Sequence, residues 1–211
     1  MTQYIKGFAL LASFLAATYS FAGAYEDMLQ AVKTDDDRMI ASLLQRGLDV
    51  NSTDVEGNSL LMLAVKEMSQ KAVKVLLGTN VNINARNALG ESALMLAALR
   101  GNLEMTRELL RKGANVEQPG WSPLMYAATS GNLEISRLLI ASGALVDARA
   151  DNDYTALLMA VREGHVEVVR LLIQAGADFN TATGSGVSPL SLARDKSRQD
   201  IVDALTSAGA K

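Results

Sequence analysis

The chain has few of the side chains that most often carry out chemistry. His165 is its only histidine and it has no cysteine, which excludes disulfides, a thiolate nucleophile and cysteine metal ligands. A serine triad would have to recruit this single imidazole. We therefore expect His165 to be structural, and we predict no catalytic residue, no metal site and no cofactor.

Three further motifs have both a chemical and a structural interpretation. Residues 184–186 are Gly-Ser-Gly, but they lack the lysine of a P-loop and the full dinucleotide glycine pattern, so we expect a turn. Met62, Met95 and Met125 could offer thioethers to copper(I). Filling of a core by flexible apolar side chains is the interpretation that we prefer.

Two groups of aspartates are expected to serve the local backbone. Asp151 and Asp153 lie in a polar stretch without the spacing of a calcium loop, so we expect solvated turn residues. Residues 35–37 are Asp-Asp-Asp and are expected to open a helix, because carboxylates are favourable at the positive end of the helix dipole.

The elements that must position any site are six copies of one pattern. The fifth residue after each start is alanine and the seventeenth is leucine, and successive starts are 33, 33, 30, 33 and 33 residues apart. Such a period predicts stacked units, each too small to bury its apolar face alone. The starts are Glu26, Ser59, Ser92, Ser122, Thr155 and Ser188, the alanines Ala31, Ala64, Ala97, Ala127, Ala160 and Ala193, and the leucines Leu43, Leu76, Leu109, Leu139, Leu172 and Leu205.

The fifth copy shows what one unit contains. Thr155 is a helix N-cap candidate, residues 156–162 form a first short helix and residues 165–174 a second. Gly176 is expected to end the second helix in the left-handed conformation, and 177–187 to form a turn or hairpin. The same glycine recurs in other copies, and the second copy has Asn80 instead, which we expect to adopt the same conformation.

These residues resemble the ankyrin repeat. The matching parts are Ser122-Pro123-Leu124, Ala127-Ala128, Gly164-His165, Leu109-Leu110 and Gly176-Ala177. The resemblance implies an all-α ankyrin-repeat solenoid of helix-turn-helix pairs with hairpin fingers, comprising six repeats of which the polar first and last are caps. The family's histidine at the third residue after the start is replaced by Leu29, Met62, Met95, Met125, Leu158 and Ser191, so we expect apolar packing there.

The resemblance also implies which side chains face the concave groove of such a stack. They are the residue before each start and the fourth and seventh residues after it. Aromatic side chains and arginine dominate binding hot spots, so a partner-binding surface is expected there. Its predicted residues are Glu91, Leu99, Trp121, Tyr126, Tyr154, Met159 and Arg162.

Trp121 has two interpretations. The connection from Gly113 to Ser122 spans nine residues where the others span twelve, and residues 118–120 (Gln-Pro-Gly) predict a compact turn in it. Trp121 therefore either anchors a partner or packs the shortened turn.

The N-terminus predicts an export signal. Lys6 precedes an uncharged, mostly apolar run at residues 8–21, and Ala-Gly-Ala at 22–24 suits signal peptidase. The 14-residue run is short of the ~20 residues that span a bilayer. We expect cleavage after Ala24, a domain at residues 25–211 and no stable membrane insertion. An exported chain without cysteine favours a bacterial periplasm, with the extracellular space as the alternative.

The predicted function is non-enzymatic binding of a protein partner by a chain that is monomeric on its own. A net charge of −3 argues against nucleic acid. The alternative within binding is a periplasmic immunity or stress-protection factor that neutralises or stabilises an enzyme or toxin. The resemblance permits it, since some exported bacterial ankyrin proteins are linked to toxin immunity or oxidative-stress defence. An enzyme would need a titratable constellation that the sequence lacks, and a structural spacer would tolerate changes to its groove.

Overall fold

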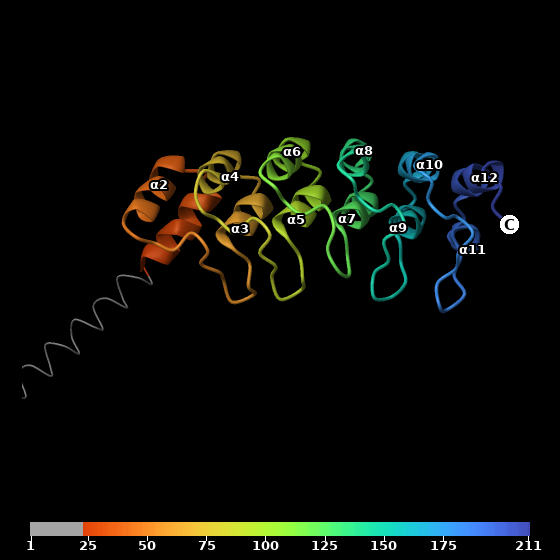
Figure 1. Cartoon of the computed structure of the whole chain (residues 1–211), viewed down its shortest axis with the longest axis horizontal. Helices are drawn as coiled ribbons and strands as arrows, with labels where there is room; N and C mark the ends of the chain where they lie inside the picture. The colour runs from red at the N-terminus through yellow and green to blue at the C-terminus, as the bar shows by residue number, and fades with distance from the viewer. Residues whose placement is uncertain (1–22) are drawn as a thin grey trace, which may run out of the picture. The chain divides into compact units, whose positions relative to one another are not determined.

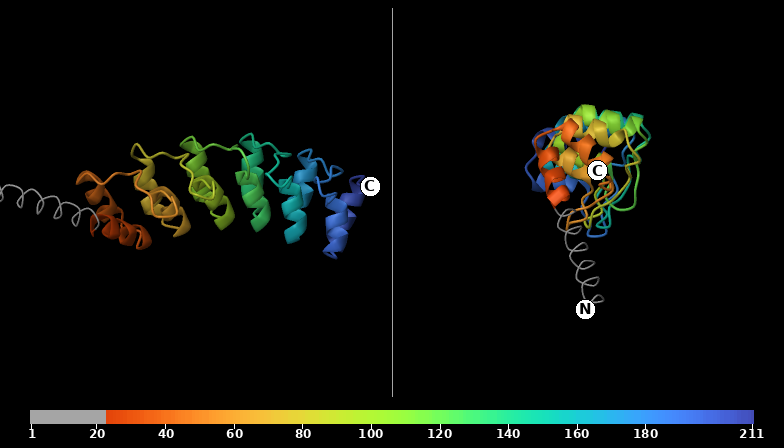
Figure 2. Two further views of the ribbon diagram at one scale, coloured as in Figure 1. Left: turned by 90° about the horizontal axis from the view of Figure 1, so that it is seen from below. Right: turned by 90° about the vertical axis from the view of Figure 1, so that its left-hand side faces the viewer.

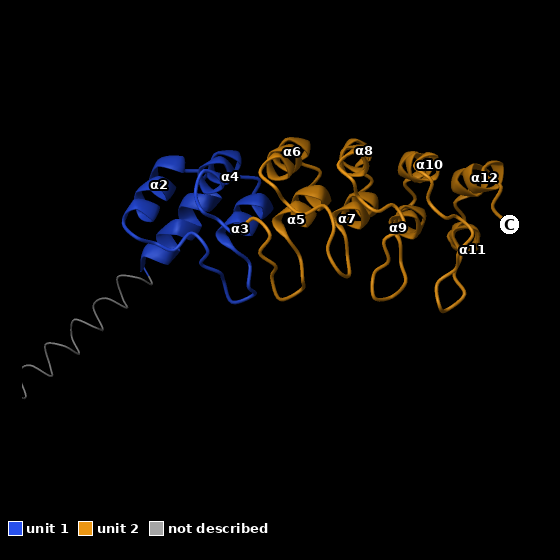
Figure 3. Cartoon of the chain, viewed as in Figure 1, with its two compact units in different colours: residues 1–82 blue, residues 83–211 orange. Residues whose placement is uncertain are grey.

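The computed structural model describes residues 23–211. The chain divides into two compact units, residues 1–82 and 83–211 (Figure 3). Throughout the described residues the regular secondary structure is α-helix, with one isolated bridge between Thr53 and Ser59. The all-α class is therefore confirmed. Residues 1–22, which hold most of the predicted export signal, lie outside the described part of the chain.

The described part of the first unit, residues 23–82, contains two helix pairs. Residues 23–33 are helical, and α2 begins after Asp36, whose carboxylate accepts a hydrogen bond from the amide of Met39 at 3.0 Å. The prediction that the aspartate run opens a helix is thus confirmed. The remaining bounds are α2 Asp37–Gln45, α3 Leu60–Lys66 and α4 Gln70–Leu77.

The second unit contains four helix pairs whose helices lie in two rows (Figure 1). The first helix of each pair packs on the first helix of the next, and the second helices pack likewise. Figure 2 shows the successive pairs side by side. The first-helix row is α5 Ala93–Arg100, α7 Pro123–Ser130, α9 Ala156–Glu163 and α11 Pro189–Asp195. The second-helix row is α6 Leu103–Arg111, α8 Leu133–Ala141, α10 Val166–Gln174 and α12 Gln199–Ser207.

The repeating residues fall where the period predicts. From the second copy on, each start is an N-cap whose hydroxyl accepts an amide hydrogen bond, which satisfies a donor that the helix leaves unpaired. All six recurring alanines and all six leucines are at most 3% exposed. A methyl group lets neighbouring helices approach closely, and leucine fills the space between the two rows.

A ladder of side chains also links neighbouring repeats. In each case one polar side chain accepts a hydrogen bond from a backbone amide one repeat further along. Because the bond fixes the register of one loop on the next, it positions the fingers, the loops that join successive pairs. The pairs are Asn51 with the amide of Asn82, Asn84 with Asn115, Glu117 with Leu145, Asp147 with Asp178, and Asn180 with Lys211, at 2.7–3.3 Å.

The junction between the two helices of a pair has a left-handed residue in all six copies. In three copies it is glycine, at Gly101, Gly131 and Gly164, and in each a side chain of the next repeat lies within 3 Å of where a Cβ would be. A Cβ on Gly131 would lie 2.5 Å from Nδ1 of His165. The other copies have Asp35, Met68 and Ser197, with φ of 53–60°, a feature that sequence reasoning missed.

His165 is accordingly part of a junction. Its Nε2 lies 3.0 Å from the carbonyl oxygen of Thr129 in the preceding repeat. Asn132 and Arg198 hold the same place in their repeats and donate to the carbonyl oxygens of Ala98 and Glu163. This bonding agrees with the structural role expected for His165.

Two details of the predicted helices are corrected. The second helix of the fifth copy begins at Val166, with His165 as its N-cap rather than its first residue. Asn80 does not have a positive φ. The hydroxyl and amide of Thr79 both donate to the carbonyl oxygen of Leu76, at 2.6 and 3.0 Å, so α4 ends before a left-handed residue is needed.

The junction can be tested with two glycines that share a left-handed backbone. Gly143 has φ of 95° and open space within 4 Å of where a Cβ would lie, whereas Gly131 has His165 there. We expect Gly143→Ala to lower the free energy of unfolding by about 1–2 kcal/mol for the backbone alone. Gly131→Ala should cost roughly 1 kcal/mol more, because His165 must leave Thr129. Urea unfolding measures both, and equal losses would contradict the role of His165.

Candidate functional site

The predicted surface residues lie in the second unit, on α5, α7 and α9 and directly before them. Leu99 on α5 is 38% exposed, and Glu91, Trp121, Tyr126, Tyr154 and Arg162 are partly exposed. These six residues are the candidate face. Met159 is different, since it is 0% exposed. The expectation that Met159 lies on the surface is wrong, because it is buried with the apolar residues of α9.

Trp121, Tyr126 and Glu91 form one cluster across two neighbouring repeats. The rings of Trp121 and Tyr126 meet edge to face, with centroids 5.6 Å apart and planes at 76°. The hydroxyl of Tyr126 donates to Oε1 of Glu91 at 3.0 Å, while Oε2 accepts from Nδ2 of Asn87 at 2.8 Å. Two aromatic rings and a carboxylate are therefore held in a fixed arrangement.

The electrostatics of this cluster favour a neutral phenol beside a charged carboxylate. Burial raises the pKa of Tyr126 above its ordinary value, and the charge of Glu91 and its hydrogen bond raise that pKa further. Because a tyrosinate would lie against the Glu91 carboxylate, the phenol keeps its proton and remains a hydrogen-bond donor.

Tyr154 and Arg162 form a second cluster in the next repeat. The guanidinium carbon of Arg162 lies 5.6 Å from the centroid of the Tyr154 ring, which is cation–π geometry. Nε of Arg162 also pairs with Oε1 of Glu163 at 2.8 Å. Since α7 packs against α9, both clusters belong to one continuous part of the second unit.

The short finger before α7 is held by side chains that sequence reasoning did not single out for this role. Nε2 of Gln118 donates to the carbonyl oxygens of Trp121 and Gly90, at 3.2 and 3.3 Å, and contacts Sδ of Met95. Nε of Arg86 also donates to the Gly90 carbonyl, at 2.8 Å. Both interpretations of Trp121 therefore keep support, because its backbone is fixed in the turn while its ring remains partly exposed.

The longer fingers show what the short one lacks. Each closes with a backbone bond over four residues, from the amide of Asp54, Asn87, Ala150 and Thr183 to the carbonyl of the fourth residue after it. The sequence signal that could have identified the role of Gln118 is the three-residue deletion itself. A finger too short to form the closing backbone hydrogen bond needs a side-chain donor or acceptor in its place.

The other chemical candidates are used by the fold. Met62, Met95 and Met125 are at most 1% exposed, as core filling predicts. The amide of Gly184 donates to Oδ2 of Asp153 at 3.0 Å, so the Gly-Ser-Gly segment is a turn held by the preceding finger. Asp153 is thus more than a solvated turn residue. Its Oδ1 also lies 3.7 Å from Nη1 of Arg149.

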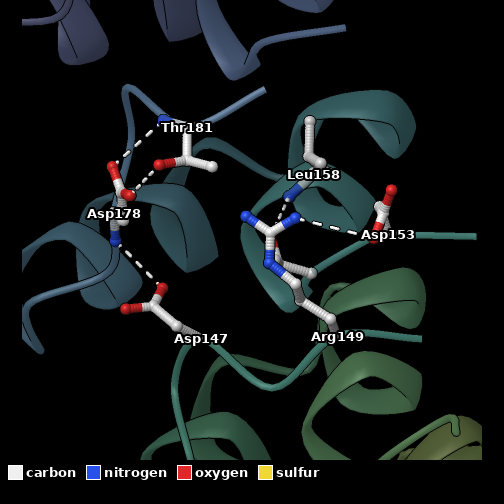
Figure 4. Close-up of a pocket in the computed structure, with 7 residues that line it drawn as sticks. Asp147, Arg149, Asp153, Leu158, Asp178 and Thr181 are labelled. Atoms are coloured by element: carbon white, nitrogen blue, oxygen red, sulfur yellow. Dashed lines mark hydrogen bonds and ion pairs between the residues drawn. The ribbon is translucent and has the colours of Figure 1, made fainter. Parts of the chain in front are cut away.

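A polar cavity of about 210 Å³ is lined by Asp153 and Arg149 together with Asp147 and Asp178 (Figure 4). Oδ1 of Asp147 accepts from the amide of Asp178, and Asp178 accepts from the amide and hydroxyl of Thr181. The Thr181 hydroxyl, followed by backbone amides, holds the pKa of Asp178 below its ordinary value. These carboxylates are bound to the backbone of the loops, and the bond from Asp178 to Asp147 is part of the ladder between repeats. The cavity is therefore explained by the packing of the loops.

Two features of residues 23–211 bear on other functions. No group of three or more histidine, cysteine or acidic side chains is arranged to hold a metal ion in that range. No helix there combines the length and the apolar composition needed to cross a bilayer.

Known proteins match this architecture. The family model for ankyrin repeats (3 copies) matches residues 61–150 and 143–211. An ankyrin-repeat domain of Acinetobacter baumannii AYE is 31% identical, with a TM-score of 0.78, over 87% of this chain and 98% of that one. The ankyrin-repeat domain of human ASB11 is 24% identical, with a TM-score of 0.79, over 87% and 84%. No curated protein matches the chain.

The coupling of Tyr126 to Glu91 predicts a pH dependence. A raised pKa in the folded state contributes stability below the unfolded tyrosine value of about 10, and this stability is lost as the pH rises further. The free energy of unfolding should therefore fall more steeply above pH ~10 in the wild type than in Tyr126→Phe. Glu91→Gln should lower the pKa of one tyrosine in an ultraviolet titration. Identical titrations of wild type and Glu91→Gln would show that the two groups are not coupled.

Proposed function

Because the chain belongs to the ankyrin-repeat family, we propose that it is a protein-binding module whose partner docks on the candidate face of the second unit. Ankyrin repeats in general mediate protein–protein interactions and are typically not enzymes. Within this family the finer question is which surface binds. The observation that carries the proposal is the partly exposed aromatic cluster of Trp121 and Tyr126, followed in the next repeat by Tyr154 and Arg162.

The physical support for this face is its composition and its rigidity. Tryptophan, tyrosine and arginine are the residues most often found at binding hot spots. Their positions are set before a partner arrives, by the bond from Tyr126 to Glu91 and by the ring contact of Arg162. Docking on a preorganised surface costs little side-chain entropy, so more of the contact energy remains as affinity.

Photo-crosslinking tests the face directly. A photoreactive residue at Leu99 should capture a partner from an extract of the source cells, and one at Arg137 on α8, 58% exposed and in the other row of helices, should not. Adding Trp121→Ala and Tyr154→Ala should reduce capture from position 99, because each anchor contributes about 2 kcal/mol or more, equivalent to a ~30-fold loss of affinity. Circular dichroism checks that the stack stays folded.

Two results would contradict the proposed face. The first is the same captured band from positions 99 and 137. The second is capture from position 99 that is unchanged when both anchors are replaced in a folded protein.

We further propose that the protein is exported by a bacterial cell and acts in the periplasm. The support is the apolar run at residues 8–21 with Ala-Gly-Ala after it, together with the similarity to a domain from Acinetobacter baumannii. Expression in a bacterium should give a periplasmic protein whose first residue is Tyr25. Ala24→Lys should block this cleavage, because signal peptidase requires a small residue there. An intact chain recovered from the cytosol would overturn the proposal.

A further inference from the structure

We propose that Glu91, Trp121 and Tyr126 receive a cationic side chain, arginine or lysine, from the protein partner. The inference rests on the proposed function and names the chemistry that this part of the face recognises. It comes from comparing the same two positions in successive repeats: the residue before the start, and the seventh residue after it.

In two repeats the chain itself places a cation over the residue before the start. In the second copy, Nζ of Lys66 donates to Oδ1 of Asn58 at 3.1 Å. In the fifth copy, the guanidinium of Arg162 lies 5.6 Å from the ring centroid of Tyr154. In these two copies the seventh residue thus reaches back over the residue before the start and brings positive charge to it. In the first copy the seventh residue, Lys33, is also basic but makes no such contact with the ring of Tyr25.

In the third and fourth copies the residue before the start can attract a cation, but the seventh residue after the start is not basic. Their residues before the start are Glu91, a carboxylate, and Trp121, the aromatic ring that attracts cations best. Their seventh residues are Leu99, which is uncharged, and Thr129, whose hydroxyl donates back to the carbonyl of Met125 at 2.8 Å. Within residues 23–211, neither Glu91 nor Trp121 forms an ion pair or a ring contact with a lysine or arginine.

The geometry of the cluster suits such a guest. Two ring planes at 76° with centroids 5.6 Å apart form a corner against which a cation contacts π-electron density. The Glu91 carboxylate is bound to Tyr126 on one oxygen and to Asn87 on the other. Each oxygen of a carboxylate can accept two hydrogen bonds, so each retains one acceptor site for a guanidinium or an ammonium.

Arg86, the basic residue in the finger before α5, already donates hydrogen bonds to backbone carbonyls. Nε of Arg86 donates to the carbonyl oxygen of Gly90, and its Nη2 to that of Pro119 at 3.3 Å. Arg86 therefore ties the two fingers together, and within residues 23–211 no lysine or arginine forms an ion pair with Glu91.

The single tryptophan makes the site measurable, because Trp121 is the only one in the chain. Its fluorescence would be titrated with N-acetyl-arginine amide, N-acetyl-lysine amide and the neutral N-acetyl-citrulline amide, at constant ionic strength. We expect saturable changes with at least one of the cationic probes and none with citrulline amide. The comparison of arginine with lysine identifies which cation the site prefers.

Three variants separate this site from general charge effects. Glu91→Gln keeps an oxygen that can accept from Tyr126, and it should weaken probe binding about tenfold through loss of the charge. Glu134→Gln, which removes a carboxylate 66% exposed on α8, should leave binding unchanged. Thr129→Arg should supply from the chain the cation that Arg162 supplies one repeat later, and should suppress the response to the probe.

A response to citrulline amide equal to that to the cationic probes would overturn the inference, and so would equal affinity of wild type and Glu91→Gln. These failures differ from failure of the proposed function. If Trp121→Ala and Tyr154→Ala abolish crosslinking while Glu91→Gln has no effect on the probe, the face binds a partner without a cation. If the probe binds as expected but crosslinking is unchanged by both anchor replacements, the cation site exists on a surface that is not the docking face.

Discussion

Each helix pair of this protein can bury its apolar side only against a neighbouring pair. The recurring alanines and leucines are almost completely inaccessible to solvent, yet no single repeat has enough surface to enclose them. Neighbouring repeats must therefore meet in one register, and the bonds that set this register are from side chains to backbone. There are two examples in the second unit. The side-chain carbonyl of Asn84 accepts from the amide of Asn115, and Nε2 of His165 lies within hydrogen-bond distance of the carbonyl oxygen of Thr129.

The candidate face depends on this register. Tyr126 belongs to one repeat and Glu91 to the one before it, and their hydrogen bond exists only when the two repeats are correctly stacked. The same holds for Gln118, which reaches back from the short finger to Gly90. Side chains placed by such bonds are as rigid as the stack itself. A partner would meet a surface already formed, which is the usual advantage of repeat proteins as binding modules.

Sequence reasoning succeeded where one repeat contains the cause. The period placed the alanines and leucines, and the hydroxyl N-caps followed from local rules for helix ends. It failed where the cause lies in the tertiary contacts. Met159 was predicted on the surface because the ankyrin resemblance places the fourth residue after each start in the groove, but in α9 that position is buried. Asn80 failed for a local reason instead, because the hydroxyl of Thr79 already donates to the carbonyl oxygen of Leu76 at the end of α4.

The sequence predicted which positions form the candidate face, but it could not predict which of their side chains contact one another. That Tyr126 bonds Glu91, and that Arg162 covers Tyr154, depend on side-chain lengths across a gap between elements. The left-handed backbone of Met68 was missed for a similar reason. At three junctions a side chain of the next repeat lies where a Cβ on the glycine would be, and the sequence of one repeat does not say what its neighbour presents.

A repetitive protein must place its specificity where it departs from its own repeat, because identical surfaces cannot distinguish one position along the stack from another. In this protein two departures from the repeat occur together, the shortened finger before α7 and the aromatic cluster of Trp121 and Tyr126. The finger before α7 is three residues shorter than the others, and Gln118 replaces the backbone bond that closes the longer fingers. Trp121 directly follows that shortened segment and contacts Tyr126. Because Gln118 in the shortened finger donates to the carbonyl oxygen of Trp121, the deletion and the cluster are best understood as one feature.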